Sequence, residues 1–462
     1  MAETLEGLAA ELEHGQATAV GLIERAFQRI EAFDSRLNSF VALDRSGALV
    51  AAKESDERRS RGRVHSRLDG IPISVKDNLH VAGFPTTWGS RALQDYRPAK
   101  DELPIARLRR AGMIVIGKTN APEFTLEGYT RNDLFGVTRN PWNTDLTPGG
   151  SSGGAAASVA AAFVPAAIGT DGGGSIRRPA CHTGLVGYKP SIGRWPRADG
   201  LPAILTDFET AGSLARTIED TLLLDAVLRG PDPRDWRSSY APAPSWPNKT
   251  ARILYVPRFG AAPVDPEVAS QVEAFARRLS SMGHDVREGE VFFDLEIAAR
   301  VWHVVSRAGV AWLMAENPTY EKLAGATARA MAEDGRKVSG ADYLGALEAV
   351  SAIRRLVAEL FAGVDLVLTP TAAALPWPAD KPYPDRIDGK PAGPRDHAIF
   401  TGWVNIAGVP AVSLPVGISR SGLPIGAHLA GAFGADDQLL VFAREVSRAI
   451  PPLPLPQFEA AL

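Results

Sequence analysis

The chain has 462 residues, 45% of them hydrophobic, so it can bury a large core. A formal net charge of −3, with 22% charged residues, excludes a strongly basic nucleic-acid-binding protein, and we expect no nucleic-acid partner. The single cysteine, Cys181, excludes a framework of internal disulfides and favours a cytoplasmic location. The segment 1–15 is acidic and does not follow the pattern of a signal peptide.

The first part of the chain, 2–62, is predicted to be helical. Thr18 can cap a helix, because apolar residues recur after it at helical spacing. These residues are Leu22, Ile23, Ala26, Phe27 and Ile30. A second helical pattern covers 46–61 and ends in a run of charged residues.

From residue 70 the pattern changes to short apolar strands that alternate with helices. Strands are predicted at 71–75, 113–116, 164–168, 253–256, 366–369, 411–416 and 425–430, and a helix at 216–228. The uncharged segment 153–169 is shorter than the ~20 residues that span a bilayer. Because Pro165 also interrupts it, we expect a buried helix followed by a strand, and no membrane association. The alternation predicts an α/β fold, with helices on both faces of a mixed central β-sheet.

The organisation predicted for the whole chain, 1–462, is a single domain. Its catalytic core is expected at about 65–230 and 365–450. The Pro-rich segment 231–247 marks a boundary or a long surface loop. A helical excursion follows at about 264–361, with the clearest helical patterns at 267–282 and 344–361.

Two serines set among glycines are the most informative feature of the sequence. The run 149–154 reads Gly-Gly-Ser-Ser-Gly-Gly, and Ser175 follows three consecutive glycines. Glycine lets backbone N–H groups approach a ligand closely, so the N–H groups around Ser175 can converge on one point. Such a cluster of donors next to a hydroxyl suits an enzyme that holds an oxyanion beside a nucleophile.

A serine hydroxyl needs a base, and the sequence offers two candidates. His182 is the histidine nearest to Ser175, but neither glycine-flanked serine lies in a Gly-x-Ser-x-Gly elbow. Lys76 ends an apolar strand, and burial lowers the pKa of a lysine. A fall from ~10.4 to about 7.5 corresponds to about 4 kcal/mol of differential solvation. The histidines and the one cysteine form no metal-binding pattern, so no metal or cofactor is expected.

These residues resemble the motifs of the amidase signature family. The signature begins with the run 149–154 and closes at 169–180 with Gly-x-Asp-x-Gly-x-Ser-Ile-Arg-x-Pro-Ala. Further blocks match at 70–77, 86–90, 117–124, 139–142, 405–411 and 422–426, whereas 231–364 resembles the family poorly. Gly172 departs from many relatives, which carry threonine or glutamine there.

The resemblance implies the amidase signature fold and a Ser-cisSer-Lys triad that hydrolyses amides through an acyl-enzyme. By motif, Ser175 is the nucleophile, Ser151 the bridging serine in a cis peptide, and Lys76 the base. The product amine or ammonia leaves after a proton relay along these three residues. The oxyanion is expected against the backbone N–H groups of Gly172, Gly173, Gly174 and Ser175.

Three neighbours of the triad have two interpretations each. Ser152 either supports the site by hydrogen bonding or simply opens a helix. Asp171 and Arg177 form either an ion pair that brackets the nucleophile loop or a pair of ligands for a substrate carboxylate.

The substrate pocket is predicted from position in the chain alone. Tyr129 and Arg131 are candidates on one side, and Phe400 and Trp403 on the other. Aromatic residues on both sides suggest an apolar or aromatic acyl group in a small-molecule amide, although ordinary core packing also explains them. Arg131 is a candidate for binding a carboxylate instead.

Two alternatives to a stand-alone amidase stay open. One is the A-type glutaminase subunit of a tRNA-dependent amidotransferase, but 205–212 departs from the Ala-Ser-Ser-Leu-Asp-Gln-like run of those subunits. The other is a non-catalytic binding protein on the same fold, which the presence of all three triad residues disfavours. By analogy with the family, a homodimer through the N-terminal helices is expected.

Overall fold

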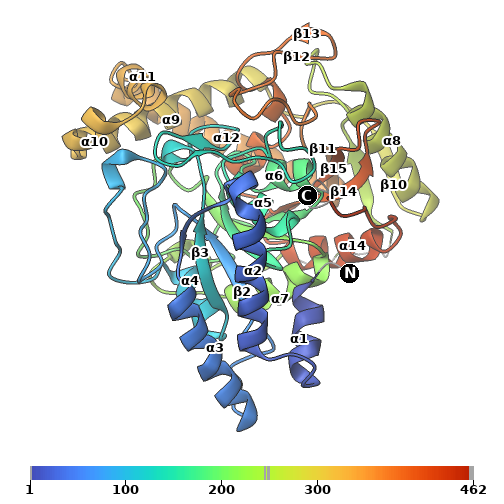
Figure 1. Cartoon of the computed structure of the whole chain (residues 1–462). Coiled ribbons are helices and arrows are strands. Elements are labelled where there is room, and N and C mark those ends of the chain that lie inside the picture. The colour runs from blue at the N-terminus through green and yellow to red at the C-terminus, as the bar shows by residue number, and fades with distance from the viewer. Residues whose placement is uncertain (1–2, 244–245, 247–249, 457–462) are drawn as a thin grey trace.

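The computed structural model describes residues 3–243, 246 and 250–456. Its described part contains one sheet of eleven strands, with parallel and antiparallel pairs (Figure 1). In spatial order the strands are β1 (Phe40–Leu43), β3 (Ile114–Thr119), β2 (Pro72–Lys76), β6 (Ala166–Asp171), β8 (Thr210–Ala215), β7 (Val186–Lys189), β14 (Ala411–Ile418), β15 (Pro424–Gly431), β11 (Leu366–Pro370), β9 (Arg252–Tyr255) and β10 (Asp285–Glu288). Two small hairpins, β4 (Arg131–Asn132) with β5 (Gly136–Val137) and β12 (Arg386–Ile387) with β13 (Lys390–Pro391), lie outside this sheet.

Helices cover both faces of the first half of the sheet. One hydrophobic cluster joins α1 (Leu5–Glu13), α4 (Leu103–Arg110) and α7 (Ile218–Leu228) to the sheet. Another joins α2 (Ala19–Leu37), α3 (Arg45–Ser60), α5 (Gly153–Ala160) and α6 (Arg177–Thr183) to it. Val115 belongs to the first cluster and its neighbours Ile114 and Ile116 to the second, because successive side chains of a strand point to opposite faces. The predicted α/β sandwich is therefore confirmed.

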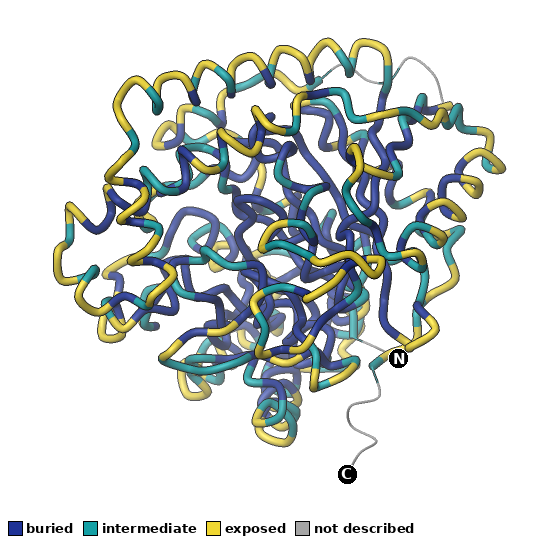
Figure 2. Tube along the Cα trace, turned by 90° about the horizontal axis from the view of Figure 1, so that it is seen from above, coloured by how far each residue is buried: buried dark blue, intermediate teal, exposed yellow. Residues whose placement is uncertain are grey.

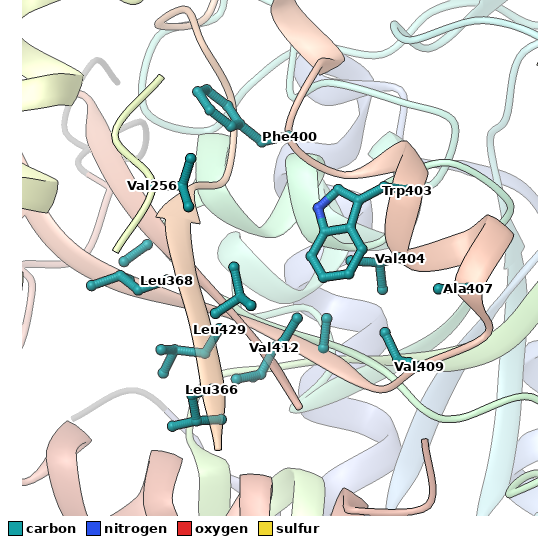
Figure 3. Close-up of a cluster of buried hydrophobic side chains, with 14 of the residues drawn as sticks. Val256, Leu366, Leu368, Phe400, Trp403, Val404, Ala407, Val409, Val412 and Leu429 are labelled. Carbon is teal, nitrogen blue, oxygen red and sulfur yellow. The ribbon is translucent and has the colours of Figure 1, made fainter. Parts of the chain in front are cut away.

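A larger core surrounds the second half of the sheet (Figure 3). Side chains of β9, β11, β14 and β15 pack there against helices, and Figure 3 shows Leu368, Val412 and Leu429 in one cluster with Trp403 and Val404. The helices are α8 (Pro266–Ser281), α9 (Leu295–Glu316), α12 (Gly340–Gly363), α13 (Gly402–Ala407) and α14 (Asp436–Ser447). Figure 2 shows the buried chain in the middle of the molecule and the exposed residues around its rim.

The segment between β10 and β11 forms a separate group of helices. In Figure 1, α9, α10 (Pro318–Leu323) and α11 (Ala326–Gly335) lie at the opposite end of the molecule from α1 and α3. Their apolar residues pack with Trp88, Phe124 and Ile204 of the first half of the chain. No helix in the described ranges is long and apolar enough to span a membrane.

The seven predicted strands are confirmed as β2, β3, β6, β9, β11, β14 and β15, and the helix at 216–228 as α7. Two segments predicted to be helical each contain a strand as well. Strand β1 interrupts 2–62 and pairs with β3, and β10 interrupts 264–361 and pairs with β9. The predictions at residues 2, 244–245 and 247 lie outside the described residues.

Leu368 on β11 tests this core, because it is fully buried in the cluster of Figure 3. Leu368→Ala should lower the free energy of unfolding by about 2–5 kcal/mol, the range for truncating a buried leucine. The shift of the thermal midpoint measures this loss. Leu344→Ala, at a residue that is 67% exposed, is the matched control and should change the midpoint little. Equal shifts in the two variants would contradict the placement of this core.

Candidate active site

The proposed triad is assembled by two adjacent parallel strands. Strands β2 and β6 pair in parallel, with Val75 opposite Ile168, so their carboxyl ends lie side by side. Lys76 is the last residue of β2. Ser175 lies in the turn between β6 and α6, and Ser151 lies just before α5, the helix that precedes β6. Consecutive and neighbouring elements thus bring these three residues to one edge of the sheet.

The amine of Lys76 is enclosed by oxygen atoms. Its Nζ donates to Ser151 Oγ at 2.7 Å, to Thr170 Oγ1 at 3.0 Å and to the Thr170 carbonyl at 3.3 Å. Asn78 Nδ2 also donates to Thr170 Oγ1, at 2.9 Å. Lys76 is fully buried. Its nitrogen therefore has a fixed position against the hydroxyl of Ser151.

Burial lowers the pKa of Lys76 to about 7, against the opposing influence of the Glu209 and Asp171 charges. A large fraction of the amine is therefore neutral near neutral pH. A neutral amine at 2.7 Å from Ser151 Oγ can accept the proton of that hydroxyl.

The two adjacent serines have different contacts. The Gly150–Ser151 peptide bond is cis. Ser152 is the N-cap residue of α5, yet its side chain does not cap the helix. Its Oγ donates to the Thr170 carbonyl at 3.1 Å, and its N–H donates to the Ser175 carbonyl at 3.1 Å. This geometry favours the supporting role of Ser152 over that of a helix opener.

Asp171 organises the turn that carries Ser175. Its carboxylate accepts from Arg177 Nη2 at 2.8 Å and from Arg177 Nε at 2.9 Å, and both side chains are fully buried. The N–H groups of Gly174 and Ile176 also donate to it, at 2.6 Å and 3.1 Å. Asn405 of α13 donates to the same carboxylate at 3.0 Å. This geometry favours the ion-pair interpretation of Asp171 and Arg177.

Burial by itself would raise the pKa of Asp171. The charge and hydrogen bonds of Arg177, with those of Asn405 and the Gly174 N–H, outweigh it and hold the pKa well below its usual range. Asp171 therefore stays ionised and keeps its donors at any pH at which the protein works.

The predicted oxyanion hole needs one correction. The Gly174 N–H already donates to Asp171, so this group is not a free donor for an oxyanion. Gly174 has φ +108, and a Cβ there would lie 2.2 Å from Thr401 Oγ1, which explains the glycine. The N–H groups of Gly172, Gly173 and Ser175 have no hydrogen-bond partner among the described residues. These three residues also line the cavity described next.

A cavity of about 520 Å³ opens onto Ser151 and Ser175. Its wall is largely apolar and aromatic, with contributions from Phe259, Phe293, Trp302 and Trp403. Helix α9 and the segment 394–403 supply much of this wall.

The structure places the four predicted pocket residues differently. Trp403 lines the cavity, in agreement with its position in the chain. Phe400 is fully buried and packs against Phe259 with ring centroids 4.9 Å apart. Tyr129 lies with its backbone against Gly150, and Arg131 lies exposed on β4. Phe400, Tyr129 and Arg131 are absent from the cavity wall, because core packing and the β4–β5 hairpin hold them elsewhere.

Two reactive side chains close to Ser175 in the sequence, His182 and Cys181, take no part in proton transfer near neutral pH. His182, the alternative base, lies outside the cavity wall, and burial lowers its pKa to about 3. Burial raises the pKa of Cys181 to about 12, so its thiolate is not accessible near neutral pH. Within the described ranges, no cluster of three or more His, Cys, Asp or Glu side chains is placed to hold a metal ion.

Sequence reasoning missed several residues of the site. Asn78 completes the surroundings of the Lys76 amine through Thr170, and it lies directly beside the matched block 70–77. Trp302 and Arg307 of α9 line the cavity, but they belong to the segment that resembles the family poorly. No sequence signal marked those two, because helical periodicity does not show which face of α9 borders a cavity.

Comparisons with known proteins agree with this geometry. A family model described as Amidase matches residues 21–440. The chain is 34% identical over 477 residues to the A subunit of the glutamyl-tRNA(Gln) amidotransferase of Synechococcus sp. (strain CC9605), with 96% of each chain covered. A bacterial aryl acylamidase of the amidase signature enzymes has a TM-score of 0.89 at 27% identity, with 97% of this chain and 96% of that one covered. The 6-aminohexanoate cyclic dimer hydrolase has a TM-score of 0.87 at 26% identity, with 99% of each chain covered.

The lowered pKa of Lys76 predicts the pH dependence of catalysis. Protonated Lys76 cannot accept a proton, so the rate should rise as the pH increases through about 7. Rate profiles between about pH 5.5 and 9 should show this limb, and Lys76→Ala should abolish it along with most of the activity. Lys189, a buried lysine whose pKa burial also lowers to about 7, provides the control. Lys189→Met should leave the limb in place, and a limb that survives in Lys76→Ala would assign it to another group.

The buried pair of Asp171 and Arg177 predicts an effect on stability. Arg177→Met leaves a buried carboxylate without its counter-charge, which should cost about 3–5 kcal/mol of unfolding free energy. Denaturant titration measures this loss. The partly exposed pair of Arg354 and Asp207 is the control, since breaking it with Arg354→Met should cost about 1 kcal/mol or less. Similar losses in the two variants would contradict the role given to Asp171.

Proposed function

The chain belongs to the amidase signature family of hydrolases and is an amidohydrolase, and we propose that it cleaves a carboxylic amide through an acyl-enzyme on Ser175. The contact of 2.7 Å between Lys76 Nζ and Ser151 Oγ, beside Ser175 in one cavity, carries this proposal.

The proposed reaction has two halves. Neutral Lys76 takes the proton of Ser151, which takes the proton of Ser175 as its Oγ bonds to the amide carbon. The oxyanion forms against the N–H groups of Gly172, Gly173 and Ser175. The C–N bond then breaks, and the leaving nitrogen takes a proton from Ser151. In the second half, water attacks the ester, the relay takes its proton, and the carboxylic acid leaves as Ser175 recovers its hydrogen.

The proposed substrate is a small-molecule amide with a sizeable apolar group. The cavity volume of about 520 Å³ and its aromatic wall support this part of the proposal. The aryl acylamidase and the cyclic dimer hydrolase are named for non-peptide amides, and both resemble this chain over nearly its full length. A cytoplasmic location also belongs to the proposal, since the one cysteine is a buried free thiol.

A second candidate is the glutaminase subunit of a tRNA-dependent amidotransferase. The curated relatives favour it over the stand-alone amidase, because the A subunits of glutamyl-tRNA(Gln) amidotransferases match with 34% and 35% identity across more than nine-tenths of the chain. In that case the amide is glutamine, and other subunits are required as partners. The same triad chemistry serves both candidates, so the substrate and the partners distinguish them.

The nucleophile is tested with Ser175→Ala on a panel of aliphatic and aryl amides. The rate should fall by about 10⁴-fold or more, as for other serine hydrolases that lose the nucleophile. Mass spectrometry of wild-type enzyme quenched during turnover should show the acyl group on the peptide that contains Ser175. Ser158→Ala, at a buried serine of α5 outside the cavity, is the control and should retain activity. Full activity of Ser175→Ala would refute the proposed mechanism.

Ammonia release from free glutamine separates the two candidates. The stand-alone amidase should hydrolyse an aryl amide without partners and release little ammonia from glutamine. The glutaminase subunit should release ammonia from glutamine once the remaining subunits of the Synechococcus amidotransferase are added. The second result would replace the small-molecule proposal.

A further inference from the structure

Three arginines line the cavity without a carboxylate partner. Arg178, Arg307 and Arg395, called here the arginine cluster, border the same cavity as Ser175. None of them forms an ion pair with any carboxylate that the structure describes. Arg178 is only 2% exposed, and its Nε, like that of Arg307, is buried without a hydrogen-bond partner.

The known contacts of the cluster are all to uncharged groups. Arg178 Nη1 lies 2.8 Å from His397 Nε2, and Arg307 Nη1 donates to Ser306 Oγ at 3.3 Å. The guanidinium of Arg395 lies over the ring of Trp302, 5.7 Å from its centroid. These contacts position the side chains without pairing any of them with a carboxylate.

Three carboxylates also line the cavity, and one of them, Glu209, is in an ion pair among the described residues. Glu209 accepts from Arg197 at 2.7 Å. Glu127 accepts from Thr327 at 3.2 Å, and Asp396 accepts from the Gly393 N–H at 2.7 Å. The cavity therefore combines an apolar wall with three arginines, none of which forms an ion pair with these carboxylates.

The pKa values of Arg178 and Arg395 agree with their lack of a carboxylate partner. Burial lowers the pKa of Arg178 to about 9, and the charge of Arg395 adds to the effect. Desolvation and the charge of Arg307 lower the pKa of Arg395. A bound anion would relieve both the repulsion and the desolvation.

The cluster adjoins the reacting centre. A Cβ on Gly173 would lie 3.5 Å from Arg395 Nη2 and 3.2 Å from Trp302 Cη2. Gly173 belongs to the proposed oxyanion loop, so a group on these arginines lies within a few bonds of the scissile carbonyl. A planar guanidinium suits a carboxylate, which it can bind through two parallel hydrogen bonds.

We propose that the arginine cluster binds a carboxylate carried by the amide substrate, so that the enzyme acts on amides of acidic compounds. This inference rests on the proposed function, because it names the substrate class of the same cavity. The carboxylate is a fixed part of the substrate and is distinct from the acid that hydrolysis produces at Ser175.

Matched substrates test this proposal with the full-length enzyme. Glutaryl p-nitroanilide and pentanoyl p-nitroanilide differ by a carboxylate on the acyl side. Acetylated 4-aminobenzoate and acetylated 4-methylaniline differ in the same way on the amine side. The variants are Arg395→Met and the conservative Arg395→Lys, with Arg110→Met as a control for charge at an exposed end of α4.

The expected result is a preference of wild type for the acidic member of at least one pair. In Arg395→Met, the acid-to-neutral ratio of kcat/KM should fall at least tenfold, mainly through KM. Arg395→Lys should recover part of the ratio, and Arg110→Met should keep it. The thermal midpoint of Arg395→Met, compared with that of wild type, shows whether this variant is folded.

Three outcomes overturn the proposal: no acid preference in wild type, an unchanged ratio in Arg395→Met, or an equal loss on neutral amides. An equal loss on neutral amides would indicate that Arg395 stabilises the oxyanion or the fold and does not bind a carboxylate. Calorimetry with glutarate and pentanamide gives a readout that does not need turnover. If no amide is hydrolysed, the proposed function fails, whereas glutarate binding that Arg395→Met weakens still supports the anion site.

Discussion

Asp171 and Arg177 form a buried ion pair, 2.8 Å apart, where β6 gives way to the turn that carries Ser175. A buried carboxylate is costly unless its oxygens are satisfied, and here N–H donors of the turn itself satisfy them. The hydrogen bonds from these N–H groups to the Asp171 carboxylate therefore fix the conformation of the turn. Because Asn405 bonds to both partners, α13 is fixed to the same point, although it comes from the far end of the sequence. The nucleophile and one wall of the cavity thus share a single anchor.

Burial makes the amine of Lys76 neutral, whereas Asp171 stays charged although it is buried too. Asp171 keeps its charge because its donors outweigh the effect of desolvation, whereas hydroxyl and carbonyl groups surround Lys76 at close range. Acidic charges nearby favour the ammonium but do not offset desolvation. Two ionisable groups on adjacent strands therefore differ in protonation for a physical reason, and the proposed relay requires this difference.

The sequence predicts the proposed triad better than it predicts the wall of the cavity. Lys76, Ser151 and Ser175 can be identified because the glycine runs and the block at 70–77 resemble the motifs of the amidase signature family. Strands β7 and β8 escape prediction, since Gly187 and Gly212 weaken the apolar periodicity on which strand prediction depends. Gly174 is expected to be a free donor because its spacing resembles that of its neighbours, and only the folded turn shows that Asp171 engages it. Contacts between α9 and residues 394–403 join segments distant in sequence, so no local pattern encodes them.

This division separates the proposed catalytic residues from the proposed determinants of specificity. The triad and the oxyanion loop come from β2, α5 and the β6–α6 turn, whose geometry is fixed by sheet pairing and by Asp171. The cavity wall comes from α9 and the segment before α13, which pack onto the framework through apolar contacts and contribute Trp302 and Arg395. Substitutions in that wall change shape and charge while the strand pairing between β2 and β6 holds Lys76 in place. The proposed preference for one amide over another therefore depends on side chains of this wall, such as Arg395.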